Sequence, residues 1–270
     1  MLALGTVALA SVFSACSEEE EAALTPTAVE VPACLPITLP DEIGDDNLIR
    51  YTYNDKGRAT QAEYVGSAQT VDIIRDSDDR LVSIGREGDR YYIALEYSAG
   101  EIKEALYYQS EEDDQYHTEF IYTNRVNEQG LITGRTIQNF DRYAGESSND
   151  EEFTYDDRGN IVTIVRTDNV DGDIDTITVT YDDKVNPYHT VGFELDDYGL
   201  FNYKSLSKNN PVSVGRSYRD TSPNRIEYEY DEQGNPVKTT YYDVYKSTDA
   251  DGNVVEIEEG FEGVSTFECR

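Results

Sequence analysis

The sequence has no tryptophan, one methionine and only two histidines among its 270 residues. Lysine and arginine number 22 against 55 aspartate and glutamate residues, so the formal net charge is -33. A surface of this charge repels the phosphate backbone of DNA or RNA. We therefore expect no nucleic-acid partner, and a core built from tyrosine, isoleucine, valine, leucine and phenylalanine.

Motifs for catalysis are also missing. Neither His117 nor His189 lies at metal-ligand spacing from a cysteine or from the other histidine. The sequence contains no Gly-x-Ser-x-Gly elbow, phosphate-binding glycine loop or zinc signature. Carboxylates are so numerous that a glycosidase pair could be drawn almost anywhere, which makes any such pair uninformative. We expect no enzyme, no metal and no cofactor.

Two acidic segments, residues 171–175 and 249–253, could suggest calcium, because hard cations favour clustered oxygen ligands. Both lack the glycine at the sixth position and the glutamate at the twelfth that a calcium loop requires. Both also fall where hairpin turns are expected. We interpret them as turns, with calcium as the alternative.

Residues 2–15 form an apolar run that is shorter than the roughly 20 residues a membrane-spanning helix needs. The run ends in Phe13-Ser14-Ala15-Cys16, which resembles the bacterial lipobox and implies a signal peptide over 1–15 and a lipid on Cys16. The alternative is an ordinary signal peptide with an incidental cysteine. The glutamates at 18–21 resemble the export signal of Bacteroidota-type surface lipoproteins, which implies a surface-exposed outer-membrane location; the alternative is a periplasm-facing one.

Residues 16–47 contain several prolines among small residues, which predicts an extended tether before a domain spanning 48–270. Once Cys16 is lipidated, Cys34 and Cys269 are the two remaining cysteines. An exported protein meets an oxidising compartment, so this pair predicts a disulfide between the two ends of the domain. Two free thiols are the alternative.

A short motif recurs through the domain, with tyrosine before an Asp/Asn-x-x-Gly turn. Aspartate or asparagine at the first turn position caps the backbone, and glycine at the fourth adopts the left-handed conformation of a hairpin turn with a bulge. Flanking residues alternate between apolar and polar, as in half-buried antiparallel strands. The turn-forming residues of the three best copies are Tyr53, Asp55 and Gly57; Tyr155, Asp157 and Gly159; and Tyr230, Glu232 and Gly234.

These hairpins predict an all-β domain: a single open, strongly twisted antiparallel meander or roll of roughly ten or more strands. At residues 182–185 the pattern fails, because the β-branched Val185 stands where the other copies have glycine. An irregular crossover or short helix is expected near 186–223. Short glycine turns should cluster at one end of the sheet, and long loops at 109–117 and 138–151 at the other.

The Tyr-Asp-x-x-Gly-Asn/Arg hairpins resemble YD or Rhs-type repeats, and with the lipobox they resemble uncharacterised Bacteroidota surface lipoproteins. That resemblance implies a fold and a location without an assigned activity. Tyr53, Tyr155 and Tyr230 fall on the core face, whereas an exposed subset could recognise a sugar. The candidates for that subset are Tyr107, Tyr108, Tyr143, Tyr198, Tyr241 and Tyr242.

We expect a monomeric, lipid-anchored binding or interaction module whose ligand is a glycan or another envelope protein. Its membrane contact would be the lipid on Cys16. The first alternative is a structural envelope lipoprotein without a ligand, and the second is a polysaccharide hydrolase.

Overall fold

A computed structural model describes residues 33–40, 48–67, 69–86, 89–110, 115–141, 145–195, 199–219, 221–249 and 252–269. The predicted signal peptide, Cys16, Tyr143 and Tyr198 lie outside these ranges. The elements in chain order are β1 (Cys34–Pro40), β2 (Leu48–Tyr53), β3 (Ala59–Tyr64), β4 (Gln69–Arg75), β5 (Leu81–Ile84), β6 (Tyr91–Ser98), β7 (Glu101–Gln109), β8 (Tyr116–Val126), β9 (Ile132–Asp141), β10 (Gly145–Tyr155), β11 (Ile161–Asp168), β12 (Ile174–Val185), α1 (Pro187–Val191), α2 (Tyr203–Leu206), β13 (Asn209–Arg216), β14 (Asn224–Tyr230), β15 (Pro236–Thr248), β16 (Val254–Val264) and β17 (Thr266–Cys269).

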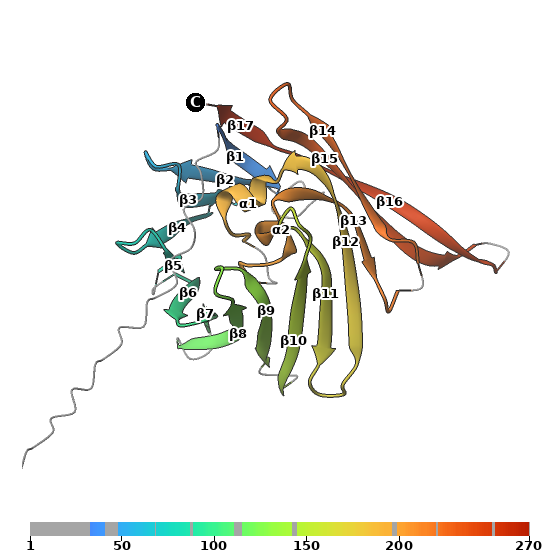
Figure 1. Cartoon of the computed structure of the whole chain (residues 1–270), viewed down its shortest axis with the longest axis horizontal. Coiled ribbons are helices and arrows are strands. Elements are labelled where there is room, and N and C mark those ends of the chain that lie inside the picture. Colours follow the sequence, from blue (N-terminus) through green and yellow to red (C-terminus); the bar gives the residue numbers. More distant parts are fainter. Residues whose placement is uncertain are drawn as a thin grey trace, which may run out of the picture.

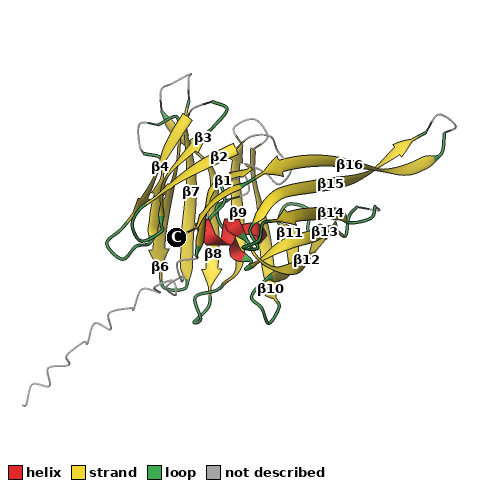
Figure 2. Cartoon of the chain, turned by 90° about the horizontal axis from the view of Figure 1, so that it is seen from above, coloured by secondary structure: helices red, strands yellow, loops and turns green. Residues whose placement is uncertain are grey.

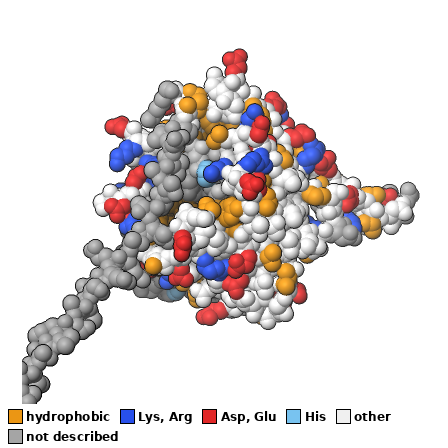
Figure 3. Space-filling view, viewed as in Figure 1, with side chains coloured by type: hydrophobic (Ala, Val, Ile, Leu, Met, Phe, Trp, Pro, Cys, Tyr) orange, Lys and Arg blue, Asp and Glu red, His pale blue; other side chains and the backbone are white. Residues whose placement is uncertain are grey.

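The strands form one antiparallel sheet of 17 strands in which neighbours in sequence are neighbours in space, so the predicted all-β meander is confirmed. β1 pairs with both β2 and β17, and the sheet rolls into a twisted, nearly closed, barrel-like shape. Figures 1 and 2 show the strands arranged around α1 and α2, with the β15–β16 hairpin projecting away from them. Acidic side chains are scattered over the face shown in Figure 3.

The recurring turns follow the predicted mechanism. In the clearest copy the Gly159 amide donates to the Asp156 carbonyl, and Gly159 has a φ of 89°. Asp156 Oδ1 accepts from the amides of Arg158 and Asn160 at 3.0 and 2.8 Å. The cap is therefore made by the first turn residue. Asp55, Asp157 and Glu232, which the sequence analysis named as turn-forming, are exposed second-position residues, and the caps come from Asn54, Asp156 and Asp231.

Alternate connections of a meander lie at the same end of the sheet. We call the end with the turns at 54–57, 76–79, 127–130, 156–159 and 231–234 the hairpin end. The predicted clustering is confirmed for these turns, although the turn closed by Asp249 and Gly252 lies at the opposite end. The long loop predicted at 138–151 is wrong. β9 and β10 pair through most of it, with Gln138 opposite Ser148 and Asp141 opposite Gly145, so both strands extend into the predicted loop.

The N-terminal boundary also needs correction. Residues 34–40, predicted as part of a tether, form β1, and Leu35 and Leu39 are almost fully buried. The carbonyls of two of its prolines accept hydrogen bonds from buried or half-buried tyrosines: Pro36 O accepts from Tyr53 and Pro40 O from Tyr188. The predicted disulfide between Cys34 and Cys269 is present and joins directly opposed residues of β1 and β17.

The irregular segment predicted near 186–223 is confirmed for residues 186–208, after which β13 resumes the meander beside β12. We call residues 186–208 the plug. Its apolar side chains belong to the main hydrophobic core together with inward-facing residues of the strands. The members from the plug are Tyr188, Val191, Phe193, Leu195, Leu200 and Phe201.

Candidate functional site

The plug folds locally because both of its short helices are capped by asparagine. Asn186 Oδ1 accepts from the Tyr188 amide, Pro187 follows at the first helical position, and Gly192 ends α1 with a φ of 88°. Asn202 and Ser205 form a reciprocal capping box on α2. Asn186 also donates to the Ser207 carbonyl at 2.9 Å, so a single buried side chain joins the two ends of the plug.

Residues of the surrounding strands, which form the wall of the barrel-like sheet, hold the plug through hydrogen bonds to its backbone. Glu104 accepts from the Leu200 amide at 2.8 Å. Arg135 Nη1 donates to the Phe201 carbonyl at 3.2 Å. Burial raises the pKa of Glu104, although the Leu200 amide and Arg135 act in the opposite direction. These bonds fix the plug against β7 and β9.

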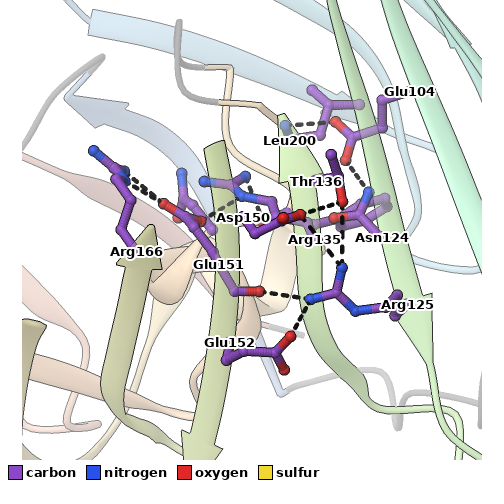
Figure 4. A network of polar contacts seen from close by, with 12 residues as sticks. Glu104, Asn124, Arg125, Arg135, Thr136, Asp150, Glu151, Glu152, Arg166 and Leu200 are labelled. Carbon is purple, nitrogen blue, oxygen red and sulfur yellow. Dashed lines mark hydrogen bonds and ion pairs between the residues drawn. The ribbon is translucent and has the colours of Figure 1, made fainter. Parts of the chain in front are cut away.

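A buried ion network lies where the plug meets the wall (Figure 4). Glu151 is 1% exposed and pairs with Arg135 at 2.6 Å and with Arg166 at 2.5 Å. The three residues are directly opposed on β9, β10 and β11. Burial by itself would raise the pKa of Glu151, but Arg135 and Arg166 outweigh it and hold that pKa below its usual value. Glu151 is therefore ionised at neutral pH, and its single negative charge is shared between two arginines.

A cleft of about 410 Å³ opens at the end of the sheet opposite the hairpin end, between the β3–β4 turn, β6 and Leu195 of the plug. We call it the tyrosine cleft. Its lining combines buried apolar residues, Ile84 and Leu195, with the exposed residues Ser67, Gln69 and Tyr91. The lining residues are Tyr64, Ser67, Gln69, Val71, Ile84, Tyr91, Tyr92, Ile93, Leu106, Glu119 and Leu195.

The tyrosine cleft adjoins an aromatic cluster on β6, β7 and β8. The Tyr92 ring stacks on Tyr107 with centroids 4.8 Å apart, and Tyr116 meets Tyr92 edge to face at 5.3 Å. Tyr108 lies 5.6 Å from His117. Tyr91 remains 45% exposed at the cleft. Aromatic faces beside amide and carboxylate groups suit a ligand with both C–H faces and hydroxyls, such as a sugar.

The tyrosines before the turns have a structural role. Tyr155 OH donates to the Ile132 carbonyl at 2.7 Å, and Tyr53 OH donates to Pro36 in the same way. In both cases the acceptor lies on the preceding strand, and burial raises the pKa of the phenol. Tyr230 instead contacts Asp182 and Asn210. None of the three lines the tyrosine cleft.

Of the tyrosines proposed for recognition, Tyr107 belongs to this cluster and Tyr108 contacts His117, but neither lines the tyrosine cleft. The structure places Tyr241 and Tyr242 on β15, where Tyr242 lies 3.8 Å below the Arg225 guanidinium. Sequence reasoning missed Tyr91 and Tyr92. The short turn between Ser98 and Glu101 fixes a register that sets them opposite Tyr108 and Tyr107, and this was the available signal.

The acidic segments form turns as predicted. Asp168 Oδ1 accepts from the Val170 amide, and Gly172 closes the turn between β11 and β12. In the described ranges no group of three or more His, Cys, Asp or Glu side chains is arranged to hold a metal ion. His117 and His189 are half-buried. Neither helix in the described ranges has the length or apolar character needed to span a bilayer.

No protein-family model matches the sequence, and a search of curated proteins finds no significant match. Among solved structures, the chain is similar to a porin-like protein from Bacteroides uniformis, at 14% identity and a TM-score of 0.41 over 87% of this chain and 95% of that one. It is also similar to the Photorhabdus luminescens Tc holotoxin pore, at 11% identity and a TM-score of 0.23 over 79% of this chain and 15% of that one. A TcdB2-TccC3-Cdc42 complex gives 11% identity and a TM-score of 0.24 over 83% of this chain and 14% of that one. All three TM-scores are below 0.5, so we base no functional argument on them.

Proposed function

We propose that the protein is a carbohydrate-binding module of the bacterial cell envelope, anchored by a lipid on Cys16 and binding without catalysis. The observation that carries the proposal is the tyrosine cleft, whose volume of about 410 Å³ falls in the usual range for small-ligand sites. The envelope location is supported by the lipobox-like segment before Cys16. The Cys34–Cys269 disulfide also suits an oxidising compartment.

The cleft offers both kinds of contact that a sugar needs. Tyr91 presents an exposed ring, and Tyr64 and Tyr92 line the same cleft. Gln69 and Glu119, which carry hydrogen-bonding groups, line the same cleft. The net charge of -33 disfavours acidic polysaccharides, so the preferred ligand is a neutral oligosaccharide.

The test is a glycan array on the chain without its signal peptide, followed by calorimetric titration with the best neutral oligosaccharide. Replacing Tyr91 with alanine should weaken binding about 2- to 12-fold, because an aromatic contact contributes about 0.5–1.5 kcal/mol. Tyr245→Ala is the matched control, since Tyr245 is 38% exposed on the distant β15–β16 hairpin. No ligand on the array would favour the structural alternative, and shortened oligosaccharide products would favour the hydrolase.

A further inference from the structure

A second cleft of about 410 Å³ lies at the hairpin end, between the β4–β5 turn and α1, and shares no lining residue with the tyrosine cleft. We call it the arginine cleft. Its mouth is marked by the exposed residues Asp78, Gly130 and Gly192. His189 on α1 also lines this cleft. The apolar wall consists of Leu81, Ile102, Ile132, Val191, Phe193, Phe201 and Leu206.

Three arginines, Arg58, Arg75 and Arg80, line this cleft. Arg58 pairs with Asp79 at 2.9 Å. Arg80 pairs with Asp76 at 2.7 Å and lies 3.7 Å from Asp78, whose side chain is 63% exposed. Two of the three arginines, Arg58 and Arg80, are thus paired with aspartates of the β4–β5 turn.

Arg75 differs from the other two. Its Nη1 donates to the Asp79 backbone carbonyl at 3.1 Å, while its Nε is buried and has no hydrogen-bond partner among the described residues. Among the described residues no carboxylate forms an ion pair with Arg75, although the chain carries 55 acidic residues. Burial lowers the pKa of Arg75, Asp79 acts in the opposite direction, and Arg58 lowers it further. Arg75 is thus a half-buried cation of the cleft without a carboxylate partner among the described residues, and a ligand carboxylate would supply one.

We propose that the arginine cleft binds an organic carboxylate with an apolar body, whose carboxylate pairs with Arg75. A planar carboxylate matches the guanidinium fork, and the apolar wall accommodates the remainder of the ligand. His189 does not act as a second cation for the ligand carboxylate, because its ring is neutral at pH 7. Its Nδ1 lies 3.0 Å from the Ser205 carbonyl and must donate to it, and burial lowers its pKa. Non-specific anion binding is opposed by the net charge of -33, so binding here requires a specific site.

The sequence offers a clean reporter, because it contains no tryptophan. Thr190 lines the cleft on α1, and a Thr190→Trp variant would carry a single indole there. A Ser67→Trp variant carries the matched reporter in the tyrosine cleft. Decanoate should change the emission of the first variant with saturation and leave that of the second unchanged. A response only in the Ser67→Trp variant would overturn the assignment without affecting the proposed carbohydrate site.

Two comparisons test the chemistry by calorimetry. On the wild-type chain decanoate should bind at least tenfold more tightly than decanol, which has the same apolar body without the charge. Arg75→Gln should reduce decanoate affinity at least tenfold. Arg50→Gln, which alters an exposed arginine of β2 that pairs with Glu63 of β3, should leave it unchanged. Equal binding of decanoate and decanol, or no binding of decanoate, would overturn the proposal even if Arg75→Gln fails to fold. Displacement of decanoate by inorganic phosphate at equal concentration would also contradict it.

Discussion

Replacing Glu151 with glutamine tests whether the buried ion network holds the plug in place. Glu151 is 1% exposed and Arg135 is 3% exposed, so neither charge can be solvated when its partner is removed. Glutamine keeps the shape of the side chain but leaves Arg135 and Arg166 without their carboxylate. Breaking a buried pair in this way costs about 3–5 kcal/mol, a large share of the roughly 5–15 kcal/mol that stabilises a typical domain.

The adjacent residue provides the control. Glu152 pairs with Arg125 at 2.6 Å, almost the same distance as in the buried pair, but its side chain is 68% exposed. Exposed ion pairs contribute about 0–1 kcal/mol. Glu152→Gln should therefore leave the unfolding free energy nearly unchanged. The two variants make the same chemical change in consecutive residues and differ chiefly in burial.

The assay is urea unfolding of the oxidised protein at pH 7, with melting temperature as a second readout. About 2–4 °C is lost per kcal/mol in a domain of this size, so Glu151→Gln should melt about 6–20 °C below the wild type. Two variants within 1 kcal/mol of each other would refute the reasoning. The direction in which the stabilisation by Glu151 changes with pH is also fixed. Because the folded pKa of Glu151 lies below its unfolded value, its contribution is present above about pH 4.3 and is lost as the pH falls through the folded pKa.

Three further changes have defined outcomes. Reducing the Cys34–Cys269 disulfide, whose cysteines are 235 residues apart, should lower the unfolding free energy by about 5–6 kcal/mol in the chain-entropy model, as measured by urea unfolding with and without reductant. Tyr155→Phe should lower the unfolding free energy by about 1–2 kcal/mol, because it leaves the Ile132 carbonyl without its donor. Tyr218→Phe, at a residue that is 61% exposed, should lower it by less than about 0.5 kcal/mol in the same assay. Because burial lowers the folded pKa of His189, wild-type stability should fall as the pH drops below about 6.5, and His189→Asn should flatten the melting-temperature profile between about pH 7.5 and 5.5; an unchanged profile would contradict the assignment.

Local features of this fold could be predicted because they are written in neighbouring residues. The turn at Asp156 and Gly159 needs only its own side-chain cap and a left-handed glycine. The failure of the same motif at Val185 correctly marked the place where the plug begins. Cysteine parity was enough to pair Cys34 with Cys269.

Long-range features could not be predicted in the same way. The pairing of β1 with β17 joins residues that are more than 200 positions apart in the sequence. The prolines of β1 suggested a tether, whereas the strand packs into the sheet through its buried leucines, Leu35 and Leu39. Glu151 could have been noticed, because it shares the core face of β10 with Phe153 and Tyr155. A carboxylate on an apolar face indicates a buried partner, but the sequence does not show that Arg135 and Arg166 supply it.

Both clefts use residues of the plug: Leu195 lines the tyrosine cleft, and His189 lines the arginine cleft. A change that loosens the plug should therefore weaken the binding of both ligands, whereas a change in one cleft should weaken the binding of one ligand only. We expect Glu151→Gln to reduce the affinity for both neutral oligosaccharide and decanoate at a temperature where the variant is still folded. Tyr91→Ala should affect only the first, and Arg75→Gln only the second. If Glu151→Gln leaves both affinities unchanged while lowering stability, the network supports the fold as a whole and does not position the plug.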